Sequence, residues 1–308
     1  MTNFERTKVR IFEVGPRDGL QNEDRKVSLK SRVRFIEDLV KAGVEDLELG
    51  AFVRGDRVPQ MADTPKLFEL MRRGALDLGQ ARGWVLVPNV KGFDRAVRAG
   101  ATHLAVFTAA SGTFSEKNSG QTIEESLREI RAVVKLARAS GMNIRGYVST
   151  AFACPFEGWI PPSRTLEVME EMVSAGIDRI SVGDTIGKAT PDRVEAVIGP
   201  ALERWGVDRI AVHFHDTRGT ALGNALRSLQ LGVRAFDTSA GGLGGCPFAP
   251  GAAGNLATED LVYMLEGMGY QTNIDLDKLC KASLDFLRRM KRPAQSRFLQ
   301  AHQGSVGG

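Results

Sequence analysis

Short apolar stretches alternate with amphipathic stretches along nearly the whole chain of 308 residues, and this alternation most limits its possible folds. Strands buried on both faces are apolar and rich in β-branched or aromatic residues. Eight stretches have this character: residues 9–14, 46–49, 83–87, 103–108, 143–148, 179–182, 209–214 and 233–238. Amphipathic helices are indicated between them, for example over residues 31–42 and 123–140. Eight strand–helix units predict a closed (β/α)8 barrel, with an open doubly wound sheet as the alternative.

The chain is expected to form a single α/β domain over residues 1–308, because barrels of this size are commonly single domains. A further helix over residues 276–290 lies beyond the eight repeats, and the tail 292–308 is expected to be mobile. Several predicted helices end just before the next strand at a glycine, which can adopt the left-handed conformation there: Gly43, Gly100, Gly141 and Gly176.

Composition argues against membrane, secreted and nucleic-acid-binding proteins. No apolar run approaches the roughly 20 residues of a membrane span, and the N-terminal residues do not resemble a secretory signal. The net charge of +4 is scattered, without a basic face interleaved with aromatic residues. Cys154, Cys246 and Cys280 form neither a CxxC pair nor a zinc spacing. We therefore expect a protein of the reducing cytoplasm, with no nucleic-acid or membrane partner.

Two histidines close the seventh predicted strand. His213 and His215 are two residues apart, so their side chains point to the same face of that strand. In a barrel of this kind the chemistry gathers at the C-terminal ends of the strands, where two neighbouring imidazoles are natural metal ligands. Two hydrogen-bonded core histidines are the alternative, although the chain has only four histidines.

Arg17 and Asp18 follow the first predicted strand. Asp18 can offer an anionic oxygen to the same cation, and Arg17 a permanently charged donor for a developing oxyanion. The alternative is an Asp–Gly turn beside a solvent-exposed arginine. Strands one, seven and eight are neighbours in a closed barrel of eight strands, so these residues are expected to converge with the histidines.

The loop over residues 240–256 follows the eighth predicted strand and is rich in glycine, with prolines at 247 and 250. This composition excludes a helix or central strand, and long loops in compact domains are commonly lids or binding loops. Cys246 is therefore a candidate acid, base or nucleophile. Asn255 can complete a site for magnesium, manganese or another first-row divalent ion through its amide oxygen. The alternative is a mobile surface loop with an incidental thiol.

Glu48 and Asp184 lie at the ends of the second and sixth predicted strands, at the same rim. Either could anchor a base, a water molecule or an arginine, and a salt bridge within the barrel is the alternative for each. Tyr147, near the end of strand five, is more typical of packing. Cys154 and Cys280 resemble small buried hydrophobic residues.

Six segments occur together in an order found in one known family: EVGPRDGLQNE at 13–23, VPQM at 58–61, RGYVS at 145–149, GDTIG at 183–187, HFHDT at 213–217 and the cysteine loop through residue 260. With them the chain resembles the 3-hydroxy-3-methylglutaryl-CoA lyases over roughly residues 9–287. The resemblance implies a metal-dependent TIM barrel that cleaves its acyl-CoA substrate into acetyl-CoA and acetoacetate, in leucine degradation and ketone-body formation. A homodimer is expected.

Carried over by motif, the resemblance implies four metal ligands: Asp18, His213, His215 and Asn255. It also implies five catalytic or supporting residues: Arg17, Cys246, Glu48, Asp184 and Glu259. The chemistry is consistent with these residue types. Cleavage needs removal of the C3 hydroxyl proton, which a cation favours, and leaves enolate charge that Arg17 can stabilise. A thiol, with a pKa of about 8.5, can then protonate the acetyl carbanion.

Three other functions remain open. Condensing synthases with related barrels typically have Glu at the position of Leu20 and lack the cysteine loop, which favours a lyase here. The segments 51–57 and 150–154 depart from the family pattern, so the substrate could be another 3-hydroxy-3-alkylglutaryl-CoA. A non-catalytic metal-binding barrel would require a broken site, and none of the expected positions is broken.

Overall fold

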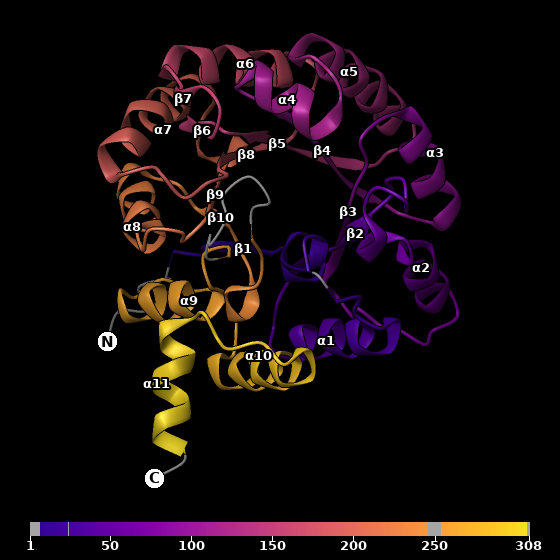
Figure 1. Ribbon diagram of the computed structural model, residues 1–308, viewed down its shortest axis with the longest axis vertical. Coiled ribbons are helices and arrows are strands. Elements are labelled where there is room, and N and C mark those ends of the chain that lie inside the picture. Colours follow the sequence, from indigo (N-terminus) through magenta and orange to yellow (C-terminus); the bar gives the residue numbers. More distant parts are fainter. Residues whose placement is uncertain (1–6, 24, 246–253, 307–308) are drawn as a thin grey trace.

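The computed structural model describes residues 7–23, 25–245 and 254–306, in which eight parallel strands close into a barrel (Figure 1). Around the barrel the strands follow the order β1-β10-β9-β8-β5-β4-β3-β2. Their bounds are β1 Arg10–Glu13, β2 Asp46–Ala51, β3 Arg82–Leu86, β4 His103–Ala109, β5 Asn143–Ser149, β8 Arg179–Asp184, β9 Ile210–Phe214 and β10 Ala235–Thr238. The predicted barrel is confirmed, and the observed strand boundaries lie within about two residues of the predicted ones.

Helices surround the barrel (Figure 1). Their bounds are α1 Leu29–Lys41, α2 Thr64–Arg72, α3 Val90–Ala99, α5 Ile123–Ala139, α6 Pro162–Ser174, α7 Pro191–Trp205, α8 Ala221–Leu231, α9 Thr258–Gly267 and α10 Leu276–Met290. The helices predicted over 31–42, 123–140 and 276–290 correspond to α1, α5 and α10. The four glycines predicted to end helices all have positive φ, between 66° and 97°: Gly43, Gly100, Gly141 and Gly176. Within the described ranges, no helix combines the length and apolarity needed to cross a bilayer.

Short elements that the sequence did not predict occupy the loops after three strands. A π-helical turn, η1 (Gly15–Gly19), follows β1, and α4 (Gly112–Ser119) follows β4. A small antiparallel hairpin of β6 (Ala153–Cys154) and β7 (Gly158–Trp159) follows β5. In Figure 1, α4 lies closer to the centre of the barrel than α5 and α6 do. These elements are too short to show a regular apolar period, so the sequence pattern carries little signal for them.

The parallel register decides which loops meet. β10 pairs with β1, where Glu13 lies beside Thr238, and with β9, where His213 lies beside Asp237. β10 therefore separates the strand that leads into Arg17 and Asp18 from the strand that carries His213. Because the barrel is closed, both neighbours reach the same mouth as the loop that follows β10.

The C-terminal tail, residues 292–308, is expected from the sequence to be mobile and without a regular element. The structure instead forms a helix, α11 (Arg297–Val306), that packs against α9 and extends away from the barrel (Figure 1). The Asp260 carboxylate accepts hydrogen bonds from the Ser296 hydroxyl at 2.6 Å and the Phe298 N–H at 2.8 Å. Leu299 is fully buried. The helix start is thus held by a distant carboxylate, which local sequence patterns do not reveal.

Candidate active site

His213, in β9, and His215, just beyond it, approach each other at the C-terminal mouth of the barrel. Their Nε2 atoms are 3.2 Å apart. Asp18, in η1, reaches the same point, with its Oδ2 atom 3.9 Å from Nε2 of His213. Each residue offers one ligand atom, and these three atoms lie within 4.8 Å of one another. The structure thus brings together three of the four predicted metal ligands.

Asn255 lies against this cluster. Its Nδ2 donates to Oδ2 of Asp18 at 2.9 Å and to the carbonyl of Leu243 at 3.1 Å. Its Oδ1 is buried and has no hydrogen-bond partner in the described part of the chain. A carboxylate, two imidazoles and an unpaired amide oxygen are donors that suit a divalent cation such as magnesium or manganese. The residues present therefore fit the metal that the resemblance implies.

Neighbouring charges at Asp18 and burial at His215 favour the protonation states that metal ligands need. Burial would likewise lower the pKa of His213, whereas hydrogen bonding to Asp237 raises it. Burial would raise the pKa of Asp18, but the charge of Arg17, with the two histidines, lowers it to about 2. Burial lowers the pKa of His215 to about 4, and the neighbouring His213 adds to this effect. Near neutral pH, Asp18 is therefore ionised and His215 is neutral. Metal ligands must be deprotonated to bind.

Arg17 lies beside the cluster, only 5% exposed, and is held by two carboxylates. Its Nε donates to Oε2 of Glu48 at 2.7 Å, and its Nη1 to Oδ1 of Asp18 at 2.8 Å. Burial would lower the pKa of Arg17, but Glu48 and Asp18 raise it above its usual value. The guanidinium therefore stays charged in a fixed orientation. Glu48 forms the salt bridge within the barrel that the sequence left open as its alternative role.

Tyr147 belongs to the same network, although the sequence indicated packing alone. Its hydroxyl donates to Oε2 of Glu48 at 3.0 Å, and its ring centroid is 5.5 Å from the Arg17 guanidinium carbon. Its ring also meets that of His213 edge to face, with 5.9 Å between centroids. The signal was available, because RGYVS is one of the family-like segments and Tyr147 ends a strand at the barrel mouth.

Asp184 and Glu259 do not reach the metal-ligand cluster but support loops around it. Asp184, at the end of β8, accepts the backbone N–H groups of Lys188 and Ala189 at 3.0 and 2.9 Å. Glu259, in α9, accepts the N–H of Gly241 at 3.0 Å. Burial raises the pKa of Glu259 to about 8. Both carboxyls are fully buried, so they act on the site through the loops that they hold.

Glu13 is a site-supporting residue that the sequence analysis missed. It is fully buried and accepts the N–H of Gly15 at 2.7 Å, the N–H of Ala240 at 3.0 Å and the hydroxyl of Thr258 at 2.6 Å. One carboxyl thus ties the loop of Arg17 to the start of the glycine-rich loop. The available signal was a carboxyl residue that follows the apolar pair Ile11 and Phe12 near the end of the predicted strand.

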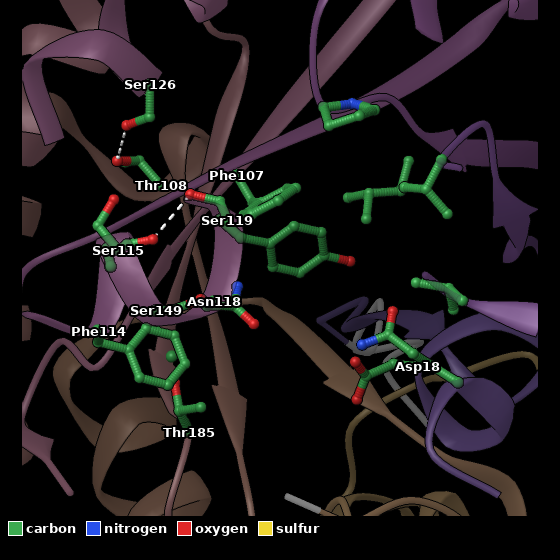
Figure 2. Close-up of a pocket in the computed structure, with 18 of the residues that line it drawn as sticks. Asp18, Phe107, Thr108, Phe114, Ser115, Asn118, Ser119, Ser126, Ser149 and Thr185 are labelled. Carbon is green, nitrogen blue, oxygen red and sulfur yellow. Dashed lines mark hydrogen bonds between the residues drawn. The ribbon is translucent and has the colours of Figure 1, made fainter. Parts of the chain in front are cut away.

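A cavity of about 570 Å³ opens beside the cluster. Its lining extends from Asp18, His213 and His215 to Ser115 and Asn118 of α4. Figure 2 shows Asp18 on one side of this space and the α4 side chains on the other. The cavity is therefore large enough for an extended ligand that reaches from the metal-ligand cluster to α4.

Two features singled out in the sequence, the atypical segment 51–57 and the loop of Cys246, lie at or next to the wall of this cavity. From the atypical segment 51–57, Val53, Arg54 and Arg57 line it, whereas Ala51 is buried beneath and its N–H donates to Thr64. The segment therefore meets the cavity through Val53, Arg54 and Arg57, and Ala51 is not among the lining residues. Cys246 lies outside the described residues, and Gly245, immediately before it, lines the cavity.

Known proteins resemble this chain over nearly its whole length. The HMGL-like family pattern matches residues 8–285. The mitochondrial hydroxymethylglutaryl-CoA lyase of Bos taurus is 45% identical over 294 residues, which cover 96% of this chain and 89% of that protein.

Solved structures agree with this match. The HMG-CoA lyase of Bacillus subtilis superimposes with a TM-score of 0.92 at 41% identity, covering 96% of this chain and 98% of that one. An HMG-CoA lyase of Acinetobacter baumannii, in complex with coenzyme A and 3-methylmalate, gives a TM-score of 0.91 at 36% identity, covering 98% and 97%. By the extent and level of these similarities, this chain belongs to the HMGL-like family.

Proposed function

We propose that this chain is a divalent-cation-dependent carbon–carbon lyase that cleaves 3-hydroxy-3-methylglutaryl-CoA into acetyl-CoA and acetoacetate. The observation that carries the proposal is the convergence of Asp18, His213, His215 and Asn255 beside the buried guanidinium of Arg17. The names of the relatives and the neighbour that holds coenzyme A support the substrate class.

The proposed metal ligands are Asp18, His213, His215 and Asn255. A cation held there would act as a Lewis acid that lowers the pKa of the substrate's C3 hydroxyl. A base takes the hydroxyl proton, and the electron pair left on that oxygen forms the carbonyl of acetoacetate while the C2–C3 bond breaks. The bond electrons pass to the thioester enolate of acetyl-CoA, which must then take up a proton.

Arg17 is proposed to stabilise the enolate oxygen. Glu48 and Asp18 fix the guanidinium before substrate binds, so little reorganisation is needed as negative charge develops. Tyr147 supports the same orientation through its hydrogen bond to Glu48. Cys246, on the glycine-rich loop, is proposed to protonate the enolate carbon, and that loop to exclude water while the enolate exists.

The identity of the cation, the oligomeric state and the cellular location are also proposed. Magnesium or manganese is the proposed cation, because the donors are a carboxylate, an amide oxygen and two imidazoles. A homodimer and a cytoplasmic location are also proposed. The free and buried state of Cys154 and Cys280 supports a reducing compartment.

Product analysis tests the function directly. Purified protein with magnesium is incubated with 3-hydroxy-3-methylglutaryl-CoA, and acetoacetate and acetyl-CoA are quantified. We expect both products in equal amounts, and none from chelator-treated protein. Failure to form acetoacetate with verified metal loading would reject the proposal. Release of free coenzyme A from acetyl-CoA and a 2-oxo acid would favour a condensing synthase instead.

A further inference from the structure

Asp237, in β10, forms a hydrogen bond to the proposed metal ligand His213, on the side of the imidazole ring that faces away from the proposed metal site. Its Oδ2 lies 3.2 Å from Nδ1 of His213, the ring nitrogen on the side away from Asp18 and His215. The two residues are direct partners in the register of β9 and β10. Their contact is therefore set by the strand pairing of the barrel and not by a flexible loop.

The Asp237 carboxylate is itself held on both oxygens. The Ser181 hydroxyl, from β8, donates to Oδ2 at 2.6 Å, and Nη2 of Arg145, from β5, donates to Oδ1 at 2.5 Å. All three side chains are buried, with 1% or less of each residue exposed. The orientation of the carboxylate is thus fixed by donors from two other strands, so it can fix the His213 ring in turn.

Arg145 is anchored mainly by this carboxylate. Its guanidinium carbon lies 3.9 Å from the ring centroid of Phe12 and 4.9 Å from that of Tyr147. Its Nε and Nη1 have no hydrogen-bond partner in the described ranges. Because a guanidinium is always charged, the buried Asp237 carboxyl that contacts it is paired with it in the ionised form.

We propose that Asp237 is a positioning residue for the metal site: it holds His213 as the tautomer that is protonated on Nδ1. An ionised carboxylate can only accept, so the shared proton belongs to Nδ1. The lone pair of Nε2 is then free and directed toward Asp18 and His215, as a metal ligand requires. Ser181 and Arg145 act on His213 only indirectly, by holding the Asp237 carboxylate. This inference rests on the proposed cation site.

The test is the affinity for Mn²⁺, measured by calorimetry without substrate. Asp237→Asn keeps the size of the side chain but offers an amide in place of a carboxylate. We expect its dissociation constant for Mn²⁺ to rise roughly 10–100-fold over wild type, the usual effect of losing such a partner. Ser181→Ala should show a smaller increase, because Arg145 still holds the carboxylate.

Asp46→Asn is the matched control. Asp46 is another buried carboxylate of the barrel that binds two arginines, Arg10 and Arg82, and the indole of Trp84. Its loss should destabilise the barrel without changing the dissociation constant for Mn²⁺. Equal Mn²⁺ affinity in wild type and Asp237→Asn would overturn the inference and leave the proposed function standing. Failure of wild type to bind Mn²⁺ would overturn both.

A second measurement needs no variant at Asp237. Nitrogen–proton correlation spectra of the metal-free wild type, recorded at about pH 9, report which nitrogen of His213 carries the proton, with His213→Gln providing the assignment. We expect protonation on Nδ1. A proton on Nε2 would overturn the inference, even if Asp237→Asn failed to fold.

Discussion

Arg17 and Glu48 form a buried ion pair at the mouth of the barrel, with Nε and Nη2 of Arg17 at 2.7 and 2.6 Å from the same oxygen of Glu48. Arg17 lies on a turn after β1, and Glu48 lies within β2. The pair therefore fixes a loop residue against the rigid barrel wall. Such a contact restricts the guanidinium to one orientation while leaving its charge beside the proposed metal ligands.

The first prediction concerns the geometry of this guanidinium. Arg17→Lys keeps a positive charge but replaces the planar fork with a flexible ammonium. We expect kcat to fall roughly 10²–10³-fold, the usual effect of losing one oxyanion donor. Mn²⁺ affinity should change less, because Arg17 is not a ligand. Near-normal turnover in Arg17→Lys would mean that charge alone is sufficient there.

The second prediction concerns the proposed proton donor. Cys246→Ser should lower kcat by roughly 10²–10⁴-fold, the range associated with a positioned general acid. Cys154→Ser and Cys280→Ser are the controls. Cys154 is buried near the Ser111 hydroxyl, and burial raises the pKa of Cys280 to about 12. Similar kcat values in all three variants would contradict a special role for Cys246.

Metal removal is the subject of the third prediction. Chelator-treated protein should lose activity and recover it with Mg²⁺ or Mn²⁺. A cation that binds only the folded state also stabilises it, by about 2.7 kcal/mol at 100 times its dissociation constant. We therefore expect the Tm to rise with Mn²⁺ in wild type but not in His215→Ala. Full activity after verified removal of metal would contradict the prediction.

The fourth prediction concerns pH and stability. Burial raises the pKa of Glu13 to about 7 and that of Glu259 to about 8, from an ordinary value of 4.5. At pH values between the ordinary pKa of 4.5 and the raised pKa of each group, the folded state binds more protons than the unfolded state. Their contribution to stability is thus complete below about pH 4.5 and is lost as the pH rises through about 8. The free energy of unfolding should therefore fall over this range.

Glu259→Gln tests this linkage because a neutral amide mimics the protonated carboxyl. Its oxygen can still accept the N–H of Gly241, so stability at about pH 6 should change little. The variant should lose less stability than wild type between about pH 6 and pH 9 in urea titrations. Glu167→Gln, at an exposed site, is the control. Parallel curves for wild type and Glu259→Gln would argue against a raised pKa.

The strands, the main helices and the positions of Asp18, His213 and His215 at strand ends followed from the sequence alone. The reason is local: buried strands and amphipathic helices differ in the period of their apolar residues, and two histidines two apart on a strand share a face. Closure of the barrel then brought the ends of β1 and β9 together with the loop after β10.

The partners of buried polar residues were decided only by the tertiary structure. Asp237 receives hydrogen bonds from Ser181 and Arg145, which lie 56 and 92 residues away in the chain. Glu13 reaches Ala240 across 227 residues. No local period predicts such contacts, because they depend on strand register and on which interior side chains meet across the barrel. A charge buried without a partner in the closed barrel would carry a large desolvation cost, so these groups pair with one another.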